Sequence, residues 1–95
     1  MAIVDISVVP IGTKTPGVSE YVREAVRIIK ASGLKYSVSP MGTIIEGDLK
    51  KVFDLVREIH EHLVKMGCQR LLTTIKIDDR RDKFQTMEEK VEKVK

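Results

Sequence analysis

KYSVSPMGTIIEG, residues 35–47, is the stretch of this sequence that decides the fold. Two short runs rich in β-branched residues, 35–39 and 43–47, stand on either side of the turn formers proline and glycine. This pattern is typical of two strands joined by a tight turn, so it predicts a β-hairpin. If Ile45 points into the core, the alternation of side chains along the second strand places Glu46 on the opposite face.

A helix is predicted on each side of this hairpin. Residues 19–32 carry apolar side chains at helical spacing, with Ser19 as a candidate N-cap and Gly33 just past the end. After the hairpin, Asp48 is placed to cap a second amphipathic helix, which ends at Gly67. The middle of the chain is therefore expected to run helix, hairpin, helix.

Two further strands are predicted outside these helices. Residues 2–10 are rich in Val and Ile, alternate between two faces and are stopped by Pro10. Residues 69–78, QRLLTTIKID, form the last strand. The order β-α-β-β-α-β is the ferredoxin-like split βαβ pattern. We therefore expect an α+β sandwich with a four-stranded antiparallel sheet and both long helices on one face.

A short helix is predicted after the last strand, at about residues 86–95. Thr86 and Glu89 stand three residues apart, which is the spacing of a capping box. A chain of 95 residues folds around a single core, so residues 1–95 are expected to form one domain. The terminal helix is then an addition to the ferredoxin-like βαββαβ unit.

The sheet face that carries no long helix is expected to pair with a second copy of the chain. It would expose Ile3, Val9 and other apolar side chains, a larger patch than monomers usually tolerate. The terminal helix supports this expectation. An isolated helix of about nine residues is marginal in water, so its edge of Met87, Val91 and Val94 must dock on something. A homodimer through the open sheet face is predicted.

A near repeat links two strand ends. SVVPIGT, residues 7–13, returns as SVSPMGT, residues 37–43. The first and second strands run parallel in this topology, so both Pro-x-Gly-Thr turns are expected at the same end of the sheet. Thr13 and Thr43 would then flank one edge of a pocket. Favourable turn chemistry alone is an equally good explanation of the repeat.

Polar side chains are expected on the open face beneath those turns. Glu46 stands among apolar neighbours, where an unpaired carboxylate would be costly, so it should be paired or bound to a ligand. The alternative is that Glu46 faces solvent or is bridged to Lys76 across the sheet. The other candidates on this face are Asp5, Ser7, Ser37 and Ser39.

Composition and cysteine content disfavour several kinds of site. The 17 Lys and Arg and the 14 Asp and Glu are interspersed, which gives a net charge of +3 without the basic stripe of a nucleic-acid-binding surface. Cys68 is the only cysteine, so no intrachain disulfide can form and a zinc site is disfavoured. The N-terminal segment is too short and too polar for a signal peptide or membrane span, so an intracellular, cytoplasmic protein is expected.

Two groups of charged or titratable residues have simple explanations. His60 and His62 are two apart on a predicted helix and point about 200° apart, so they cannot bind one metal ion together. The run DDRRD, residues 78–82, is favoured as a solvated turn with local ion pairs. The functional alternative for this run is an inter-subunit clamp or an arginine pair that receives a phosphate or carboxylate. No catalytic or metal site is predicted.

Binding is favoured over catalysis. The sequence has no Ser-His-Asp or Cys-His set at suitable positions and no phosphate-binding glycine loop. RNA binding is disfavoured, because Tyr36 is the only one of the four Tyr and Phe residues on a predicted strand. A regulatory ligand-sensing module of the ACT type shares the topology, and it is an alternative by analogy of fold alone.

The chain carries four recognisable stretches: SVVPIGT, the helix start SEYV, the hairpin KYSVSPMGTIIEG, and TTIKIDDRRD. Together they resemble the thiamine-binding protein family, whose members are small and have a ferredoxin-like fold. The resemblance spans nearly the whole chain. It implies a homo-oligomer, often a homotetramer built from face-to-face dimers, in which some members bind thiamine or its hydroxymethylpyrimidine moiety. It implies ligand binding and not catalysis, with no cofactor.

The resemblance also implies roles for individual residues. Glu46 would hold the nitrogen edge of an aminopyrimidine, Asp5 would neutralise a cationic thiazolium, and Tyr36 would supply a ring wall or a phenol. Strict alternation instead points Tyr36 at the helices, as a core aromatic. Hydroxyl groups for the ligand would come from Thr43, Ser39, Ser7 and Thr13.

Overall fold

The computed structural model describes residues 1–12 and 19–95 of the chain. Neighbouring strands of its single sheet are all antiparallel, in the order β2-β3-β1-β4. This is the ferredoxin-like βαββαβ arrangement that the sequence predicts, with an added C-terminal helix. In chain order the elements are β1 (Ala2–Pro10), α1 (Ser19–Ala31), β2 (Lys35–Ser39), β3 (Gly42–Gly47), α2 (Leu49–Lys65), β4 (Leu71–Asp78) and α3 (Met87–Glu92).

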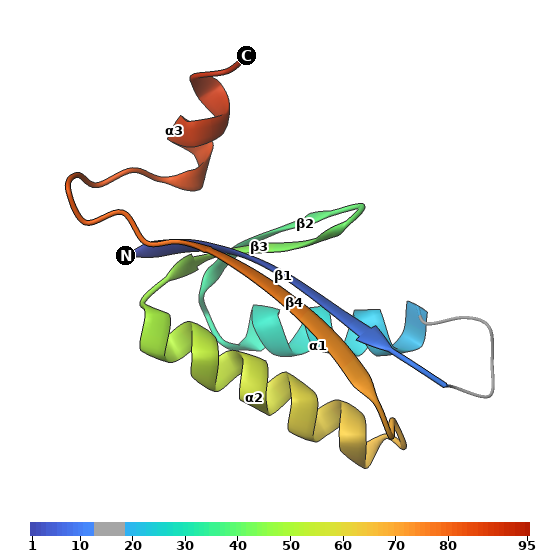
Figure 1. Cartoon of the computed structure of the whole chain (residues 1–95). Coiled ribbons are helices and arrows are strands. Elements are labelled where there is room, and N and C mark those ends of the chain that lie inside the picture. Colours follow the sequence, from blue (N-terminus) through green and yellow to red (C-terminus); the bar gives the residue numbers. More distant parts are fainter. Residues whose placement is uncertain (13–18) are drawn as a thin grey trace.

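The molecule has a helical layer on one face of the sheet. Figure 1 shows α1 and α2 on one side of the strands and α3 on the other side. β1 lies between β3 and β4 in the sheet, so it is covered by neighbours on two edges as well as by the helices. No helix within the described ranges is long and apolar enough to cross a membrane.

The bounds of several elements differ from the predicted ones. The second strand of the hairpin begins at Gly42, the last strand begins at Leu71, and α2 ends at Lys65, two residues before Gly67. Asp48 occupies the predicted N-cap position of α2, but its side chain makes no capping hydrogen bond. α3 is shorter than the predicted 86–95, because after Glu92 the chain continues in tighter turns, with Val94 N–H bonded to the main-chain oxygen of Val91 and Lys95 N–H to that of Glu92.

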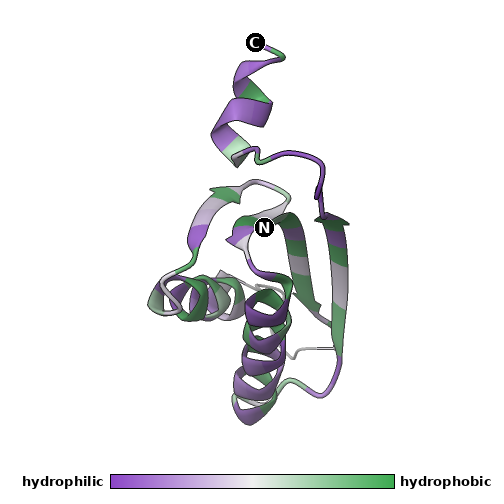
Figure 2. Cartoon of the chain, turned by 90° about the vertical axis from the view of Figure 1, so that its left-hand side faces the viewer, coloured by the Kyte–Doolittle hydropathy of each residue, from purple (hydrophilic) through white to green (hydrophobic). Residues whose placement is uncertain are grey.

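The hydrophobic core fills the space between the sheet and the two long helices. Val4 and Ile6 of β1 and Ile45 of β3 are buried and point toward the helical layer, as the alternation predicts. They belong to one cluster with Ile29 of α1 and Ile59 of α2. Figure 2 shows both long helices banded in hydrophilic and hydrophobic residues, as expected for amphipathic helices on the surface of a sheet.

The open face is the side of the sheet opposite α1 and α2. Its side chains form rows across the strands, and the register of the strand pairs determines which residues share a row. The placement of Asp5, Ser7 and Glu46 on this face agrees with the sequence prediction. In the order β2, β3, β1, β4 the rows are Lys35, Glu46, Ile3 and Asp78, then Ser37, Ile44, Asp5 and Lys76. Beyond them, Ser39 pairs with Gly42 and Ser7 pairs with Thr74.

Candidate functional site

β1 has two strand neighbours along only part of its length. Its pairing with β3 ends at Ile6 opposite Thr43, whereas its pairing with β4 continues to Pro10 opposite Leu71. Within the described part of the chain, residues 7–10 therefore have a strand partner on one side only. The main-chain N–H and C=O groups on their other side are available to whatever occupies the adjoining space.

A cavity of about 190 Å³ lies where β1 loses this partner. It is bounded by the end of β1, the turn of the β2–β3 hairpin and one side of α1, and we call it the strand-end cavity. Most of its wall is aliphatic, and its hydroxyl groups belong to serine and threonine. The lining consists of residues 6–9, residues 38–43, Val22, Ala25, Val26, Ile29 and Ile59.

The two strand ends that carry the near repeat point toward the same end of the sheet. β1 and β2 are each antiparallel to β3 and hence parallel to each other. Figure 1 shows both running toward the same side of the molecule, with the β2–β3 turn set apart from the end of β1. Ser7, Ser39 and Thr43 all line the strand-end cavity. Thr13, the fourth predicted hydroxyl, lies outside the described residues.

The hydroxyl groups of this cavity have different surroundings. Ser39 Oγ donates a hydrogen bond to the main-chain oxygen of Gly42 at 3.0 Å and accepts one from the main-chain N–H of Met41 at 3.3 Å, so it closes the hairpin turn. Thr43 is only 8% exposed. Its register with Ile6 directs the side chain to the helix side of the sheet, where it lines the strand-end cavity. That Thr43 flanks a pocket together with Thr13 stays a prediction, because Thr13 lies outside the described residues.

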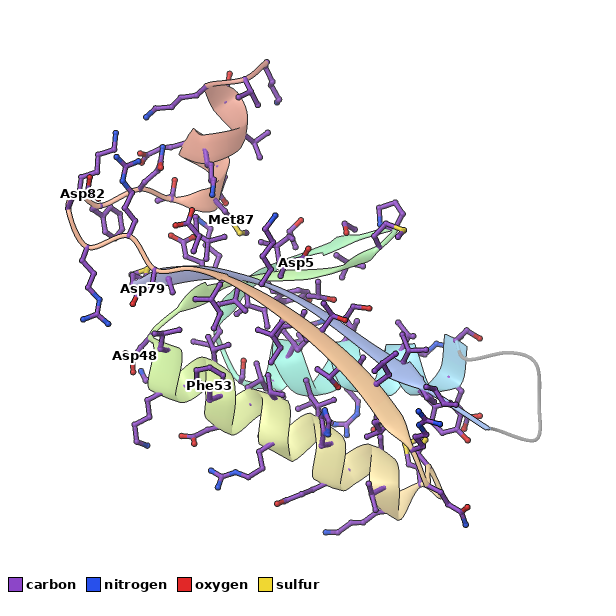
Figure 3. The ribbon with its side chains drawn as sticks, viewed as in Figure 1. Asp5, Asp48, Phe53, Asp79, Asp82 and Met87 are labelled. Carbon is purple, nitrogen blue, oxygen red and sulfur yellow. The ribbon has the colours of Figure 1, made fainter. Side chains whose placement is uncertain are left out.

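Asp5 lies next to the cavity lining, on the open face. A Cβ atom at Gly42 would be 2.9 Å from Asp5 Oδ1 and 2.8 Å from the main-chain oxygen of Ile6, so the missing side chain of this glycine leaves room for the carboxylate. Figure 3 shows Asp5 and Met87 on one side of the sheet and Phe53 on the other. Because Gly42 also lines the strand-end cavity, Asp5 brings a negative charge to its border.

Glu46 lies at the other end of the open face. It is four positions beyond Gly42 in β3, which is about 13 Å along an extended strand. Glu46 is 5% exposed, and its Oε2 lies 3.2 Å from Nζ of Lys35, in ion-pair contact without hydrogen-bond geometry. The buried carboxylate is paired, as its apolar company predicts, but with Lys35 and not with Lys76. Glu46 does not line the strand-end cavity.

Lys35 is shared by two carboxylates. Its ammonium group also donates a hydrogen bond to Glu88 Oε2 at 2.5 Å, which ties α3 to the sheet. The pKa of Lys35 lies above its ordinary value of 10.5, first because of the bond to Glu88 and then because of Glu46. The same bond holds the pKa of Glu88 below its ordinary value of 4.5. Both partners are therefore charged at neutral pH.

Tyr36 belongs to the edge of the core. It stands opposite Ile45 in the hairpin, so its ring is directed to the helix side, where it is partly buried against the core cluster. This position agrees with the prediction from alternation and not with that of a ring wall for the ligand. Tyr36 also borders a hollow of about 460 Å³ between β2 and α3, together with Met87 and Val91.

Sequence reasoning missed the parts of the cavity that come from outside the strands. Val22 and Val26 of α1 supply part of an aliphatic wall, and Met41 of the hairpin turn adds a further apolar side chain. A signal was present, because Val22 and Val26 are four residues apart, at core spacing. The spacing does not reveal that Val22 and Val26 remain partly uncovered, because the pairing of β3 with β1 ends at Ile6.

The charged run after β4 forms local ion pairs. Arg80 Nε donates to Asp82 Oδ1 at 2.7 Å, and Arg81 Nη2 donates to Asp79 Oδ2 at 2.8 Å. The hydrogen bond from the arginine is the main reason that the pKa of Asp79, and likewise that of Asp82, lies below its ordinary value. These pairs agree with the prediction of a solvated turn.

The two histidines contact different elements. His60 Nε2 lies 2.6 Å from Thr73 Oγ1 of β4, and His62 Nε2 lies 2.9 Å from Glu24 Oε1 of α1. Arg27, followed by His62, holds the pKa of Glu24 below its ordinary value. The histidines link α2 to its neighbours and do not converge on one site.

Comparisons with known proteins all point to one protein family. Residues 4–95 match the family described as thiamine-binding protein. The UPF0045 protein YqgV of Bacillus subtilis is 47% identical over 98 aligned positions, which cover 99% of this chain and 94% of that protein. A UPF0045 protein of Methanothermobacter thermautotrophicus is 40% identical over 100% of this chain and 97% of its own length.

Solved structures share the whole fold. The hypothetical protein MJ1052 of Methanocaldococcus jannaschii has a TM-score of 0.89 at 33% identity, covering 98% of this chain and 94% of that chain. TM0486 of Thermotoga maritima, described as a candidate thiamine biosynthesis or salvage protein, has a TM-score of 0.85 at 31% identity, covering 99% and 98%. These matches confirm the predicted fold and the resemblance, and the chain belongs to the thiamine-binding protein family.

Proposed function

We propose that this chain is a non-catalytic binding protein for thiamine or a hydroxymethylpyrimidine-type ligand. The pyrimidine ring occupies the strand-end cavity. One observation supports this assignment above all. In a member of a family named for thiamine binding, Ser7, Ser39 and Thr43 gather in a cavity whose remaining wall is aliphatic.

The chemistry of the cavity suits an aminopyrimidine. Its aliphatic side chains cover the faces of a planar ring, while the ring nitrogens and the exocyclic amine need donors and acceptors at the ring edge. Hydroxyl groups supply some of these, and the free main-chain edge of residues 7–10 supplies others. The Asp5 carboxylate on the open face would neutralise a cationic group that leaves the cavity in that direction.

The size of the cavity favours one ring over a whole thiamine molecule. About 190 Å³ is below the roughly 300–1,000 Å³ typical of pockets that enclose drug-sized ligands. In this proposal the pyrimidine is enclosed, and the thiazolium ring of thiamine lies outside, against the open face. Glu46, about 13 Å along β3 from Gly42, contacts neither the enclosed ring nor its edge.

In this proposal the functional protein is a homodimer, in which the open faces of two copies of the chain pack together. Val9 and Leu72 stand opposite each other on the open face and are 42% and 57% exposed. Packing two open faces together buries these side chains and covers the mouth of the cavity. The exposed edge of α3, with Val91, is available to join two such dimers into a homotetramer.

Isothermal titration calorimetry with hydroxymethylpyrimidine, thiamine and an unrelated heterocycle tests the proposal. The variant Thr43→Val keeps the shape of the side chain and removes its hydroxyl. We expect it to weaken hydroxymethylpyrimidine binding by about 3- to 10-fold, the usual effect of one lost hydrogen bond. The matched control is Thr74→Val, which alters an exposed threonine on the open face and should leave the affinity unchanged.

Two results would contradict the proposal. The first is that no pyrimidine releases heat or raises the unfolding temperature while the chain is folded. The second is that Thr74→Val weakens binding as much as Thr43→Val, which would place the ring on the open face instead of in the cavity.

A further inference from the structure

Val8 of β1 directs its main-chain groups away from β4. In an antiparallel pair, alternate residues exchange both hydrogen bonds with one neighbouring strand, and the residues between them direct their N–H and C=O groups to the other side. Ile11 N–H donates to the main-chain oxygen of Arg70 at 2.9 Å, which continues the register of β1 with β4. The odd-numbered residues of β1 therefore bond to β4. The even-numbered residues, among them Val8, direct their groups toward β3.

The pairing with β3 ends before it reaches Val8. Ile6 is the last residue of β1 in that pairing, and its main-chain oxygen would lie 2.8 Å from a Cβ atom at Gly42 of β3. The same register, continued by two residues, would place Met41 opposite Val8. Met41 belongs to the hairpin turn, and its N–H donates instead to Ser39 Oγ at 3.3 Å. Among the described strands, none therefore pairs with the N–H and C=O groups of Val8 on this side.

These two groups lie at the wall of the strand-end cavity. Val8 lines the cavity, and its side chain packs against the core cluster, which fixes the main chain at this point. The N–H and C=O groups of one strand residue point the same way, so they offer a donor and an acceptor side by side. Such groups lose free energy when they are left unpaired away from water. A ligand that pairs with both of them is therefore favoured in this cavity.

A planar ring suits this edge better than an added peptide strand. The next residue of β1 that faces the same side is Pro10, which has no N–H group. A strand added beside β1 would therefore miss a ladder bond immediately after Val8. The free edge offers one complete donor–acceptor pair, which is what a single heterocyclic ring can use.

We propose that the main chain of Val8 recognises the amidine edge of an aminopyrimidine in the strand-end cavity. Its N–H donates to a ring nitrogen, and its C=O accepts from the exocyclic amine next to that nitrogen. This inference rests on the proposed function, and it names the chemical group that the cavity selects. A side-chain amide pairs with adenine in the same bidentate way, and such a pair discriminates between bases by roughly 5- to 150-fold.

Calorimetry with hydroxymethylpyrimidine and its analogue without the exocyclic amine tests the contact of the Val8 carbonyl. We expect the analogue to bind the unmodified chain at least about tenfold more weakly, because the carbonyl is then left unpaired. Equal affinity for the two compounds would overturn this inference and leave the proposed function intact. Failure of the folded chain to bind either pyrimidine would instead refute the proposed function itself.

Val8→Pro tests the contact of the N–H group. It removes a donor that the β1–β4 ladder does not use, so we expect a folded chain with an unchanged circular dichroism spectrum. Its affinity for hydroxymethylpyrimidine should fall about tenfold. The matched control is Val8→Ala, which shortens the side chain and keeps both main-chain groups. This control should retain the preference for the amino compound, and equal affinity of the two variants for hydroxymethylpyrimidine would count against the inference.

Amide hydrogen exchange of the unmodified chain gives a readout that does not depend on how a variant folds. Saturating hydroxymethylpyrimidine should slow the exchange of Val8 N–H by at least about tenfold. Val9 N–H is the internal control, because Val9 lies opposite Leu72 in the ladder and already bonds to β4. No slowing at Val8, or the same slowing at Val8 and Val9, would show that the ring does not accept a hydrogen bond from Val8.

Discussion

At the scale of single residues, Lys35 and Glu46 show how a buried charge is tolerated in this fold. Glu46 is almost completely buried on the open face, where an unpaired carboxylate would lose its hydration without compensation. Lys35 stands directly opposite it in the β2–β3 ladder and supplies the counter-charge at 3.2 Å. The register of a five-residue strand therefore determines which cation lies beside the Glu46 carboxylate.

Removing the ammonium group of Lys35 should destabilise the fold. We expect Lys35→Ala to lower the midpoint of thermal unfolding by about 5 °C, because Glu46 is then left buried without a partner. The matched control is Lys76→Ala, which removes an exposed lysine from the same face and should change the midpoint little. Calorimetric scans of both variants give the comparison, and equal shifts would show that Glu46 does not depend on Lys35.

At the scale of elements, α3 is attached to the sheet mainly through its polar side chains. The helix has six residues, and the Thr86 side chain caps it by accepting a hydrogen bond from Glu89 N–H at 3.2 Å. Glu88 and Lys90 tie it to Lys35 and Asp78. A helix this short is marginal in water, so these contacts and any partner subunit decide whether it stays in place.

The attachment of α3 should depend on pH. The pKa of Glu88 is lowered in the folded state, so its contribution to stability is present above pH 4.5 and is lost as the pH falls through the depressed pKa. The pKa of Lys35 is raised, so its contribution is present below pH 10.5 and is lost at higher pH. Amide hydrogen exchange, corrected for the intrinsic effect of pH, should show protection of residues 87–92 decreasing first at acid pH. Unchanged protection there below pH 4, with α2 still protected, would refute this role of Glu88.

At the scale of the whole molecule, the open face is the side of the sheet that the two long helices do not cover. α1 and α2 bury one side of the sheet, while among the described elements α3 alone lies on the other side (Figure 1). Val9 and Leu72 form an exposed apolar pair near the end where the strand-end cavity lies. A partner on this face would bury that pair and close the cavity at the same time.

Disrupting the open face should dissociate the proposed dimer. Val9→Asp places a charge on the surface that the second copy would bury, so we expect a lower mass in analytical ultracentrifugation. Val64→Asp is the matched control, because Val64 is similarly exposed but lies on α2. If Val9→Asp keeps the mass of the unmodified chain, the subunits meet through another surface.

Much of the architecture follows from local patterns in the chain. Alternation in β1 places Val4 and Ile6 inward and Asp5 outward, and the hairpin at residues 35–47 separates the two helices. Long-range geometry decides what these local patterns leave open. Thr43 is buried, and it lines the strand-end cavity only because the end of β1 and one side of α1 lie next to it. Pairing of Glu46 with Lys35 instead of Lys76 required the cross-strand register.

The sequence by itself determined the order of helices and strands, the face on which each strand residue lies and the family. Each of these depends on periodicity or on motifs that are close together in the chain. Only the tertiary structure decided that Ser7, Ser39 and Thr43 share a cavity and that Glu46 does not join them. The reason is that β3 is shorter than β1, so the sheet opens beyond Ile6, and no local pattern records how far two distant strands run beside each other.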